Sequence, residues 1–168
     1  MSAKSKALKS ALLSGLAKNR AAILAAAAQV PPEARDTVFL GIWSLKDLLA
    51  HLAGWDDTNL AATKEIQAGR MPSFYAHHDK GWKSYNASLV TRYRREDFEE
   101  LLALVRETQA RLIAYLETLP PEAFERDFGV RSPSRLKITI ARLLQAEWQD
   151  EREHLRQIRD FQDKGYRP

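Results

Sequence analysis

The chain has 168 residues, of which 45% are hydrophobic, which suits one compact domain over residues 1–168 and argues against two. It contains no cysteine, which excludes a disulfide framework, a thiolate metal site and a cysteine nucleophile, so any thiol must come from a cosubstrate. The net charge of +4 suggests nucleic acid as a possible partner. Basic residues alternate with acids along the later segments, however, which is typical of a solvated helix face, so we expect no nucleic-acid partner.

The first predicted helix covers residues 4–29. Leu12 and Leu16 follow helical spacing, and Pro31 and Pro32 end the pattern because proline disfavours a helical residue before it. The lysines of this segment superficially resemble a transit peptide, but the apolar face predicts a bundle helix. No stretch approaches the roughly 20 apolar residues that span a bilayer. We therefore expect no membrane partner and, without a signal peptide, a cytoplasmic protein.

The second predicted helix covers residues 45–67, and three residues specify its start. Ser44 can cap it, Asp47 at the third helical position completes a capping box, and Trp43 can pack on the first turn as a hydrophobic staple. The short apolar run at 38–42 is too isolated to form a sheet. We expect this run to cover the open end of a bundle.

A histidine and a tryptophan mark the border of the apolar face of this second helix. His51 and Trp55 are four residues apart and therefore lie one turn above each other. The leucines of the same helix recur at helical spacing and point to a core. We expect His51 to be half-buried and to offer its imidazole toward that core.

A long loop at 71–81 follows the second helix. Loops of this length inside a compact domain are often binding loops or lids. His77 and His78 in this loop could add a ligand to a nearby site, although adjacent loop histidines are more often exposed to solvent.

The short helix predicted at 82–93 carries aromatic residues on one side. Together with Trp55, this row could line a pocket for an organic substrate, or it could only pack the loop onto the bundle. In the first case Tyr85 and Asn86 would offer hydrogen bonds. The candidate substrate-binding residues are Trp55, Trp82, Tyr85 and Asn86.

Two more long helices are predicted, one at 98–119 and one from a start within 134–139 to residue 163. Proline ends the first of them, and glycine follows the second. Polar residues interrupt the apolar stripe of the last helix, and buried polar groups need partners. This stripe consists of Ile140, Leu143, Leu144, Glu147, Glu151, His154, Ile158 and Phe161.

Asp150 and His154 on the last helix are four residues apart, a spacing that lets two side chains bind a single ion. If this helix packs beside the second, His51 supplies a third ligand and the opposite face of the ion stays open. Two imidazoles and a carboxylate suit Zn(II), Ni(II), Fe(II) or Mn(II). Glu151 is the alternative carboxylate if the helix is rotated slightly. Glu147 could act as a general base or hold a ligand in place through a hydrogen bond.

The two segments that carry these histidines resemble the signature helices of the DinB-like (YfiT-like) four-helix-bundle superfamily. That pattern has a tryptophan-rich helix start followed by one histidine, and later a His-x-x-x-His helix followed by Gln and an apolar residue. His51 matches the first histidine, and His154 with Gln157 and Ile158 matches the end of the second motif. Asp150 stands where the pattern has its other histidine.

Residues 81–87 (Gly-Trp-Lys-Ser-Tyr-Asn-Ala) and 119–124 (Leu-Pro-Pro-Glu-Ala-Phe) further resemble the ClbS/DfsB-like branch of this superfamily. The resemblance extends roughly from the first helix to Phe161. It implies an all-α four-helix bundle in up-up-down-down order, with short extra helices in the long connections. Some members of this branch lack the histidine ligands and are associated with protection against reactive small molecules.

Two functions follow from these observations. The first is a divalent-metal-dependent enzyme, of the hydrolase or thiol-transferase type, in which His51, Asp150 and His154 hold the ion. It would act on a small reactive molecule in a stress or detoxification role, with water or a low-molecular-weight thiol as the nucleophile. The alternative is a metal-free ClbS/DfsB-like protective protein that binds such a molecule in the aromatic pocket. A bundle that acts only as a homodimer also fits the sequence.

Overall fold

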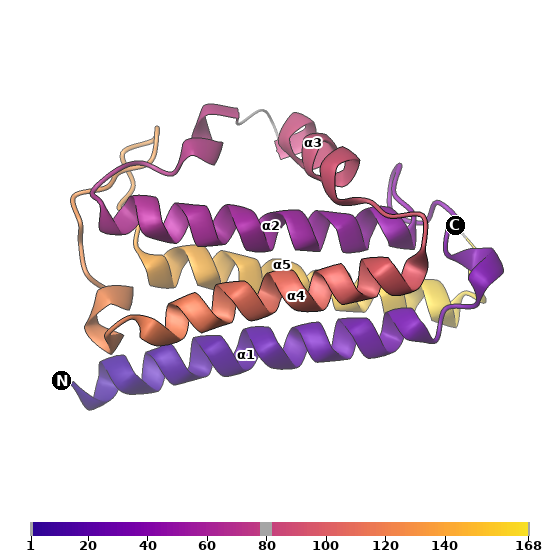
Figure 1. Cartoon of the computed structure of the whole chain (residues 1–168), viewed down its shortest axis with the longest axis horizontal. Helices are drawn as coiled ribbons and strands as arrows, with labels where there is room; N and C mark the ends of the chain where they lie inside the picture. The colour runs from indigo at the N-terminus through magenta and orange to yellow at the C-terminus, as the bar shows by residue number, and fades with distance from the viewer. Residues whose placement is uncertain (1, 78–81, 168) are drawn as a thin grey trace.

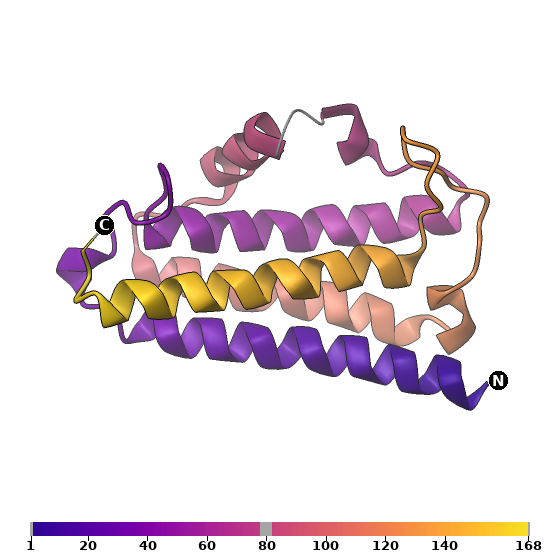
Figure 2. The same ribbon diagram turned by 180° about the vertical axis from the view of Figure 1, so that it is seen from behind.

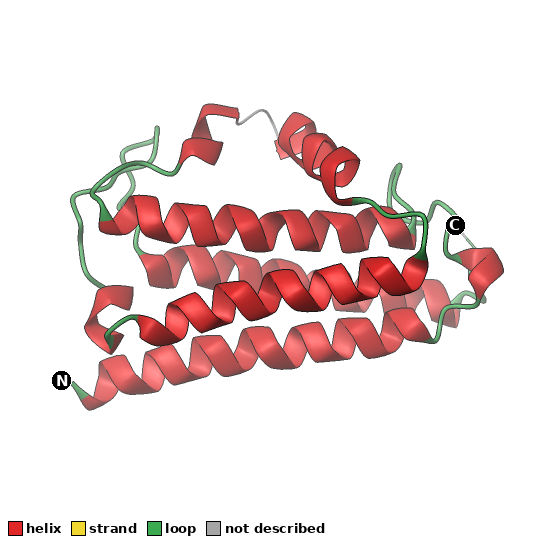
Figure 3. Cartoon of the chain, viewed as in Figure 1, coloured by secondary structure: helices red, strands yellow, loops and turns green. Residues whose placement is uncertain are grey.

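The computed structural model describes residues 2–77 and 82–167, and within them it contains five α-helices and no β-strand (Figures 1 and 3). The predicted all-α fold is therefore confirmed. The long helices are α1 (Ala3–Ala28), α2 (Leu45–Gln67), α4 (Phe98–Thr118) and α5 (Ile140–Asp163); the connections contain α3 (Lys83–Tyr93) and the 3-10 turns η1 (Pro32–Ala34), η2 (Ser73–His77) and η4 (Pro121–Phe124). Among the helices of the described part, none has both the length and the apolarity of a membrane span.

The first and last long helices, α1 and α5, lie side by side and run in the same direction (Figure 2). Arg20 near the middle of α1 donates a hydrogen bond to Glu151 of α5, and Gln162 near the end of α5 donates one to the carbonyl of Ala26 near the end of α1. Residue numbers thus increase together along the two helices. This pairing joins segments that are far apart in the sequence.

The middle helices, α2 and α4, are also parallel to each other, and they run opposite to α1 and α5. Asp56 accepts a hydrogen bond from Thr108, and Gln67 accepts one from Tyr115 farther along both helices. A helix of 23 residues is about 35 Å long, so two parallel neighbours need a connection that returns over that whole length. Residues 68–97 form this crossover.

The helix order is therefore up-down-down-up and differs from the expected up-up-down-down order. The physical reason lies in the first two of the three connections between the long helices. Residues 29–44 turn back at one end of the bundle, whereas the longer crossover at 68–97 travels along it and contains η2 and α3 (Figure 1).

Local capping fixes where the helices of the bundle begin. The Ser44 hydroxyl accepts a hydrogen bond from the backbone N–H of Asp47, and the Asp47 carboxylate accepts one from the backbone N–H of Ser44, which completes the predicted capping box. Thr139 caps α5 through the N–H of Arg142, so this helix begins at the late edge of the predicted interval. These caps set the register of the two helices that supply His51 and His154.

Two hydrophobic clusters form the core, and a layer of buried polar residues separates them. Ile23 and Leu48 belong to one cluster, and Leu16 and Leu116 belong to the other. The polar layer contains Arg20 of α1, Asp56 and Asn59 of α2, Thr108 of α4, and Glu147 and Glu151 of α5. Burying such groups costs desolvation energy. This cost favours the helix arrangement in which polar groups from the four helices form hydrogen bonds with one another.

The apolar run at 38–42 covers the end of the bundle only in part. The ring of Phe39 stacks on Phe161 of α5 with centroids 4.3 Å apart, as the prediction requires. Ile42, in contrast, is 81% exposed in a turn that pairs Leu40 with Trp43. The turn, rather than the hydrophobicity of Ile42, decides where that side chain points.

Candidate functional site

A cleft of about 590 Å³ opens beside α2 and α5. Among its polar lining residues, these two helices contribute His51, Asn59, Arg142, Glu147, Asp150 and His154. Aromatic residues from α2, η2 and the start of α3 form one wall, and the connection that precedes α5 forms another. The cleft thus combines groups that can react or bind ions with a large apolar surface.

His51, Asp150 and His154 come together in this cleft, as the sequence predicts. Oδ2 of Asp150 lies 3.1 Å from Nε2 of His154 and 3.5 Å from Nε2 of His51. The histidine side chains are 5% and 8% exposed, whereas the Asp150 side chain is 50% exposed. The cluster therefore has a closed side within the bundle and an open side toward the cleft.

The two distances from the Asp150 carboxylate fit a divalent metal ion. Metal–ligand bonds of about 2.0–2.2 Å place neighbouring ligand atoms about 3 Å apart in octahedral geometry and about 3.4 Å apart in tetrahedral geometry. Nδ1 of His154 donates to Oε1 of Gln157 at 2.8 Å, which leaves Nε2 available to an ion. Nδ1 of His51 has no hydrogen-bond partner in the described residues, but its ring packs on Trp43 at a centroid distance of 4.8 Å.

The charge states of two of these three groups, Asp150 and His51, suit metal ligands. Burial alone would raise the pKa of Asp150, but hydrogen bonds with His154 and His51 bring that pKa well below its usual value. Burial lowers the pKa of His51, so its imidazole is neutral at neutral pH. Burial would also lower the pKa of His154, but Asp150 more than offsets this effect and raises it. A carboxylate and a neutral imidazole are the forms that bind metal, so His154 has to release its proton when an ion binds.

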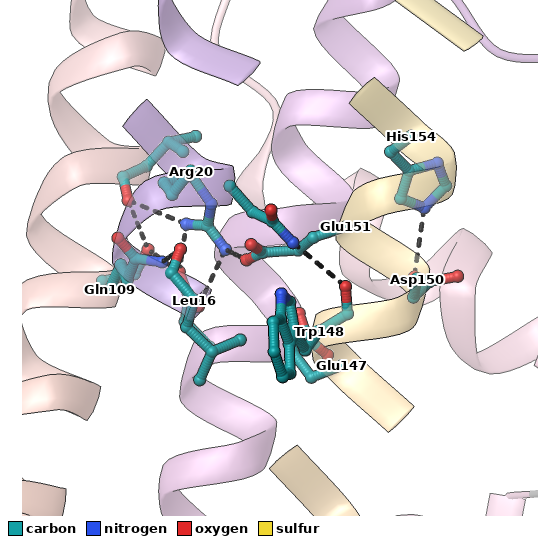
Figure 4. A network of polar contacts seen from close by, with 12 residues as sticks. Leu16, Arg20, Gln109, Glu147, Trp148, Asp150, Glu151 and His154 are labelled. Carbon is teal, nitrogen blue, oxygen red and sulfur yellow. Dashed lines mark hydrogen bonds and ion pairs between the residues drawn. The ribbon is translucent and has the colours of Figure 1, made fainter. Parts of the chain in front are cut away.

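A second polar cluster lies deeper, where α1 meets α2 and α5 (Figure 4). Arg20 donates two hydrogen bonds to the Asp56 carboxylate, at 2.8 and 3.0 Å, and one to Glu151 at 2.6 Å. Thr108 donates to Asp56 at 2.7 Å. Glu151 was the alternative third ligand, but the structure directs it to Arg20, so Asp150 is the carboxylate that joins the histidines.

Glu147 lies between the two clusters and lines the cleft. Its Oε2 accepts a hydrogen bond from Asn59 at 2.9 Å, and its buried Oε1 has no partner in the described residues. Burial, followed by the charges of Glu151 and Asp56, raises the pKa of Glu147 well above its usual value. Burial also raises the pKa of Glu151 to about 7, although Arg20 opposes this change. The raised pKa of Glu147 favours its protonated form, whereas the general base that the sequence suggested would have to be ionised.

Three of the four predicted substrate-binding residues line the cleft. Trp55 meets Phe74 and Trp82 edge-on, with ring centroids 5.4 and 6.3 Å away, and its indole N–H donates to Asn86 at 2.9 Å. Trp55, Trp82 and Asn86 are in the cleft wall. Tyr85 is not among the lining residues, because its ring packs on Trp55 and its hydroxyl is hydrogen-bonded to a threonine of α2.

Of the two loop histidines, His77 does not join this site. His77 is exposed and stacks on Tyr85 with centroids 5.8 Å apart, outside the cleft lining. His78 lies outside the described residues.

Sequence reasoning missed Arg20 and the wall that precedes α5. Arg20 interrupts the apolar stripe of α1 between Leu16 and Ile23, which was a usable signal of a buried ion pair. The wall that precedes α5 had no comparable signal in the sequence. The bridge between Arg131 and Lys137 turns the connection back on itself and brings residues 132–138 to the cleft.

The fold and the cleft define a helical-bundle protein with two histidines and a carboxylate gathered at one cavity. The chain belongs to the DinB superfamily, whose family model matches residues 16–158. It is also similar to the solved structure of the colibactin self-resistance protein ClbS in complex with a dsDNA. The TM-score is 0.74 at 18% identity, over 92% of this chain and 94% of that chain. A comparison with curated proteins finds no match. The resemblance to the DinB superfamily that the sequence indicated is thus confirmed.

The prediction that excluded nucleic acid as a partner is wrong, because ClbS, a protein of this fold, was solved in complex with dsDNA. Alternating charges along helices do not remove all basic surface. Arg94 is neutralised by Asp36 and Asp47, but Arg92 and Arg95 next to it have no ion pair within the described ranges.

Proposed function

We propose that the chain is a metal-dependent protective enzyme that inactivates a small reactive molecule by hydrolysis or by transfer of a thiol. The observation that carries the proposal is the convergence of His51, Asp150 and His154, whose ligand atoms lie within 4.8 Å of one another in the cleft. A divalent ion held there would lower the pKa of water or of a thiol and make it a nucleophile at neutral pH. The name of ClbS, a self-resistance protein, supports the protective role.

The residues of the chain have separate tasks in this proposal. Trp55 and Trp82 bind the apolar body of the substrate and exclude water from the reacting atoms. Asn59 donates a hydrogen bond to Oε2 of Glu147, and the buried Oε1 of Glu147 has no partner within the described residues. With its raised pKa, Glu147 donates a proton to the substrate oxygen or nitrogen on which negative charge develops.

Metal analysis tests the proposal directly. Protein purified without a histidine tag and reconstituted with Zn(II), Ni(II), Fe(II) or Mn(II) should retain about one ion per chain. His51→Ala should lose the ion, because it removes one of three ligands. His77→Ala is the matched control, since His77 is exposed and lies outside the cleft lining. The proposal fails if the wild type holds no ion or if His51→Ala binds it equally well.

A metal-free protective protein is the second candidate. It is favoured by the ion pair at 3.1 Å between Asp150 and His154, because the raised pKa of His154 lets that pair persist without a metal. The aromatic cleft and Glu147 would then carry the function. Activity that survives complete removal of metal by a chelator supports this candidate over the first.

We also propose that the chain binds dsDNA, as the ClbS complex suggests for this fold. The net charge of +4 and the unpaired Arg92 and Arg95 support contacts with phosphate. Fluorescence anisotropy with a labelled duplex should show affinity that falls steeply with salt. Replacement of Arg92 and Arg95 by Gln should weaken binding and lower the salt dependence. Arg156→Gln is the control because its charge is already paired with Glu153 and Asp160.

A further inference from the structure

We propose that the cleft takes a small molecule with an apolar body and one anionic group, and that Lys137 and Arg142 bind the anionic group. This inference rests on the proposed function, because it assigns a substrate class to the same cleft. It adds an anion subsite at the end of the cleft that is remote from His51 and His154.

Two exposed cations line the cleft, and Lys137 interacts with the charge of Asp127 only at longer range than an ion pair. Neither Lys137 nor Arg142 forms an ion pair with any described residue, although both are lining residues. Arg131, close by in the same connection, is paired with Asp127 at 2.8 Å. Lys137 and Arg142 differ from Arg131 and Arg135 of the same connection because only Lys137 and Arg142 line the cleft.

The structure holds one of these cations in place. The guanidinium of Arg142 donates a hydrogen bond to the carbonyl of Lys137 at 2.8 Å, which ties the first turn of α5 to the connection before it. The other N–H groups of the guanidinium have no acceptor within the described residues. A guanidinium fixed on one edge and free on another is suited to bind a carboxylate, sulfonate or phosphate oxygen.

The charges of the cleft would also orient such a ligand. The Asp150 carboxylate lies at one end and repels an anion, whereas Lys137 and Arg142 attract it at the other end. Arg142 precedes Asp150 by eight residues on the same helix, which corresponds to about 12 Å along α5. The reactive atom of the substrate should therefore lie about 12 Å from its anionic group.

The size of the cleft favours a small molecule as the occupant. A volume of about 590 Å³ is typical of a pocket for a single organic ligand. The aromatic wall of Trp55 and Trp82 suits an apolar body, whereas a DNA duplex presents its phosphates on a surface too broad to enter. Lys137 and Arg142 are thus placed to bind the anionic group of an apolar molecule that has entered the cleft.

Two fluorescent probes with the same aromatic body test this inference. One is 8-anilinonaphthalene-1-sulfonate, and the other is its neutral analogue N-phenyl-1-naphthylamine. The wild type should bind the sulfonate more tightly than the neutral probe. Lys137→Gln and Arg142→Gln should each weaken sulfonate binding roughly three- to tenfold and leave the neutral probe unchanged. Arg152→Gln is the matched control because Arg152 is exposed on α5 and does not line the cleft.

Several results would overturn the inference. Equal affinity of the wild type for both probes would show that the cleft has no anion subsite. An equal loss of sulfonate affinity in Arg152→Gln would show that the effect comes from the net charge of the protein. A dsDNA oligonucleotide serves as competitor. If it displaces the sulfonate and itself loses affinity in Lys137→Gln and Arg142→Gln, these cations bind duplex phosphates instead. The same measurements are made on chelator-treated protein and on His51→Ala. If the metal proposal fails, the preference for the sulfonate probe therefore still tests the anion subsite.

Discussion

Arg20→Met should lower the free energy of unfolding by about 3–5 kcal/mol at neutral pH, because it removes one partner of a buried ion pair. The Arg20 side chain is 1% exposed and donates hydrogen bonds to Asp56, to Glu151 and to the carbonyl of Val105. Methionine restores most of the buried volume, so little of the loss should come from a cavity. The larger part comes from carboxylates left in the polar layer without a cation.

The loss should shrink as the pH falls. In the wild type, burial has already raised the pKa of Glu151 from 4.5 to about 7, and removal of Arg20 should raise it further. A carboxyl whose pKa is higher in the folded state favours folding while it is protonated, and this contribution disappears as pH rises from the unfolded pKa through the folded one. The variant should therefore approach the wild type as the pH is lowered toward about 5.

Urea denaturation followed by far-ultraviolet circular dichroism measures both effects, at about pH 5 and about pH 8. Arg156→Met is the matched control, because Arg156 also pairs with two carboxylates, Glu153 and Asp160, but on the exposed face of α5. This control should unfold close to the wild-type midpoint. The reasoning is refuted if Arg20→Met is no more harmful than Arg156→Met, or if its loss is the same at both pH values.

Three further substitutions test separate features. Gly54→Ala should destabilise the protein by about 1–3 kcal/mol in urea denaturation, because a Cβ there would lie 2.7 Å from Cβ of Leu89 and force α3 outward; an unchanged midpoint would contradict this packing. Gln157→Leu should weaken metal binding by roughly 10- to 100-fold in a titration, because Nδ1 of His154 loses its acceptor; unchanged affinity would exclude this supporting role. Glu147→Gln should gain stability relative to the wild type as pH rises above about 4.5, since burial raises the pKa of Glu147 and glutamine does not titrate; parallel pH profiles would show that Glu147 is not buried as described.

The helices could be predicted from the sequence because their signals are local. The capping box at Ser44 and Asp47, the prolines after α1 and α4, and the spacing of apolar residues each act within one or two turns. The direction of each helix in the bundle could not be derived in this way. It depends on the path of residues 68–97, and no periodicity encodes whether a connection turns back or crosses the bundle.

The candidate site was predictable to a similar extent. The spacing of Asp150 and His154 placed both on one face of α5, and the leucines of α2 placed His51 toward the same core. The partner of each buried charge was not predictable, because Arg20 and Asp56 are brought together only by the packing of α1 on α2. Tyr85 was misplaced for the same reason, since helical spacing does not tell which aromatic ring of α3 faces the cleft.

The parallel pairing of α1 with α5 has a consequence for how the chain is made. More than a hundred residues separate the end of α1 at Ala28 from the start of α5 at Ile140. At a synthesis rate of about 5–20 residues per second, α5 leaves the ribosome roughly 6–22 s after α1. During that interval Arg20 can meet Asp56 but not Glu151, and the apolar face that α5 later covers stays open to water and to chaperones. Contacts over such a sequence separation also form slowly, so the seam between α1 and α5 should be the last part of the bundle to close.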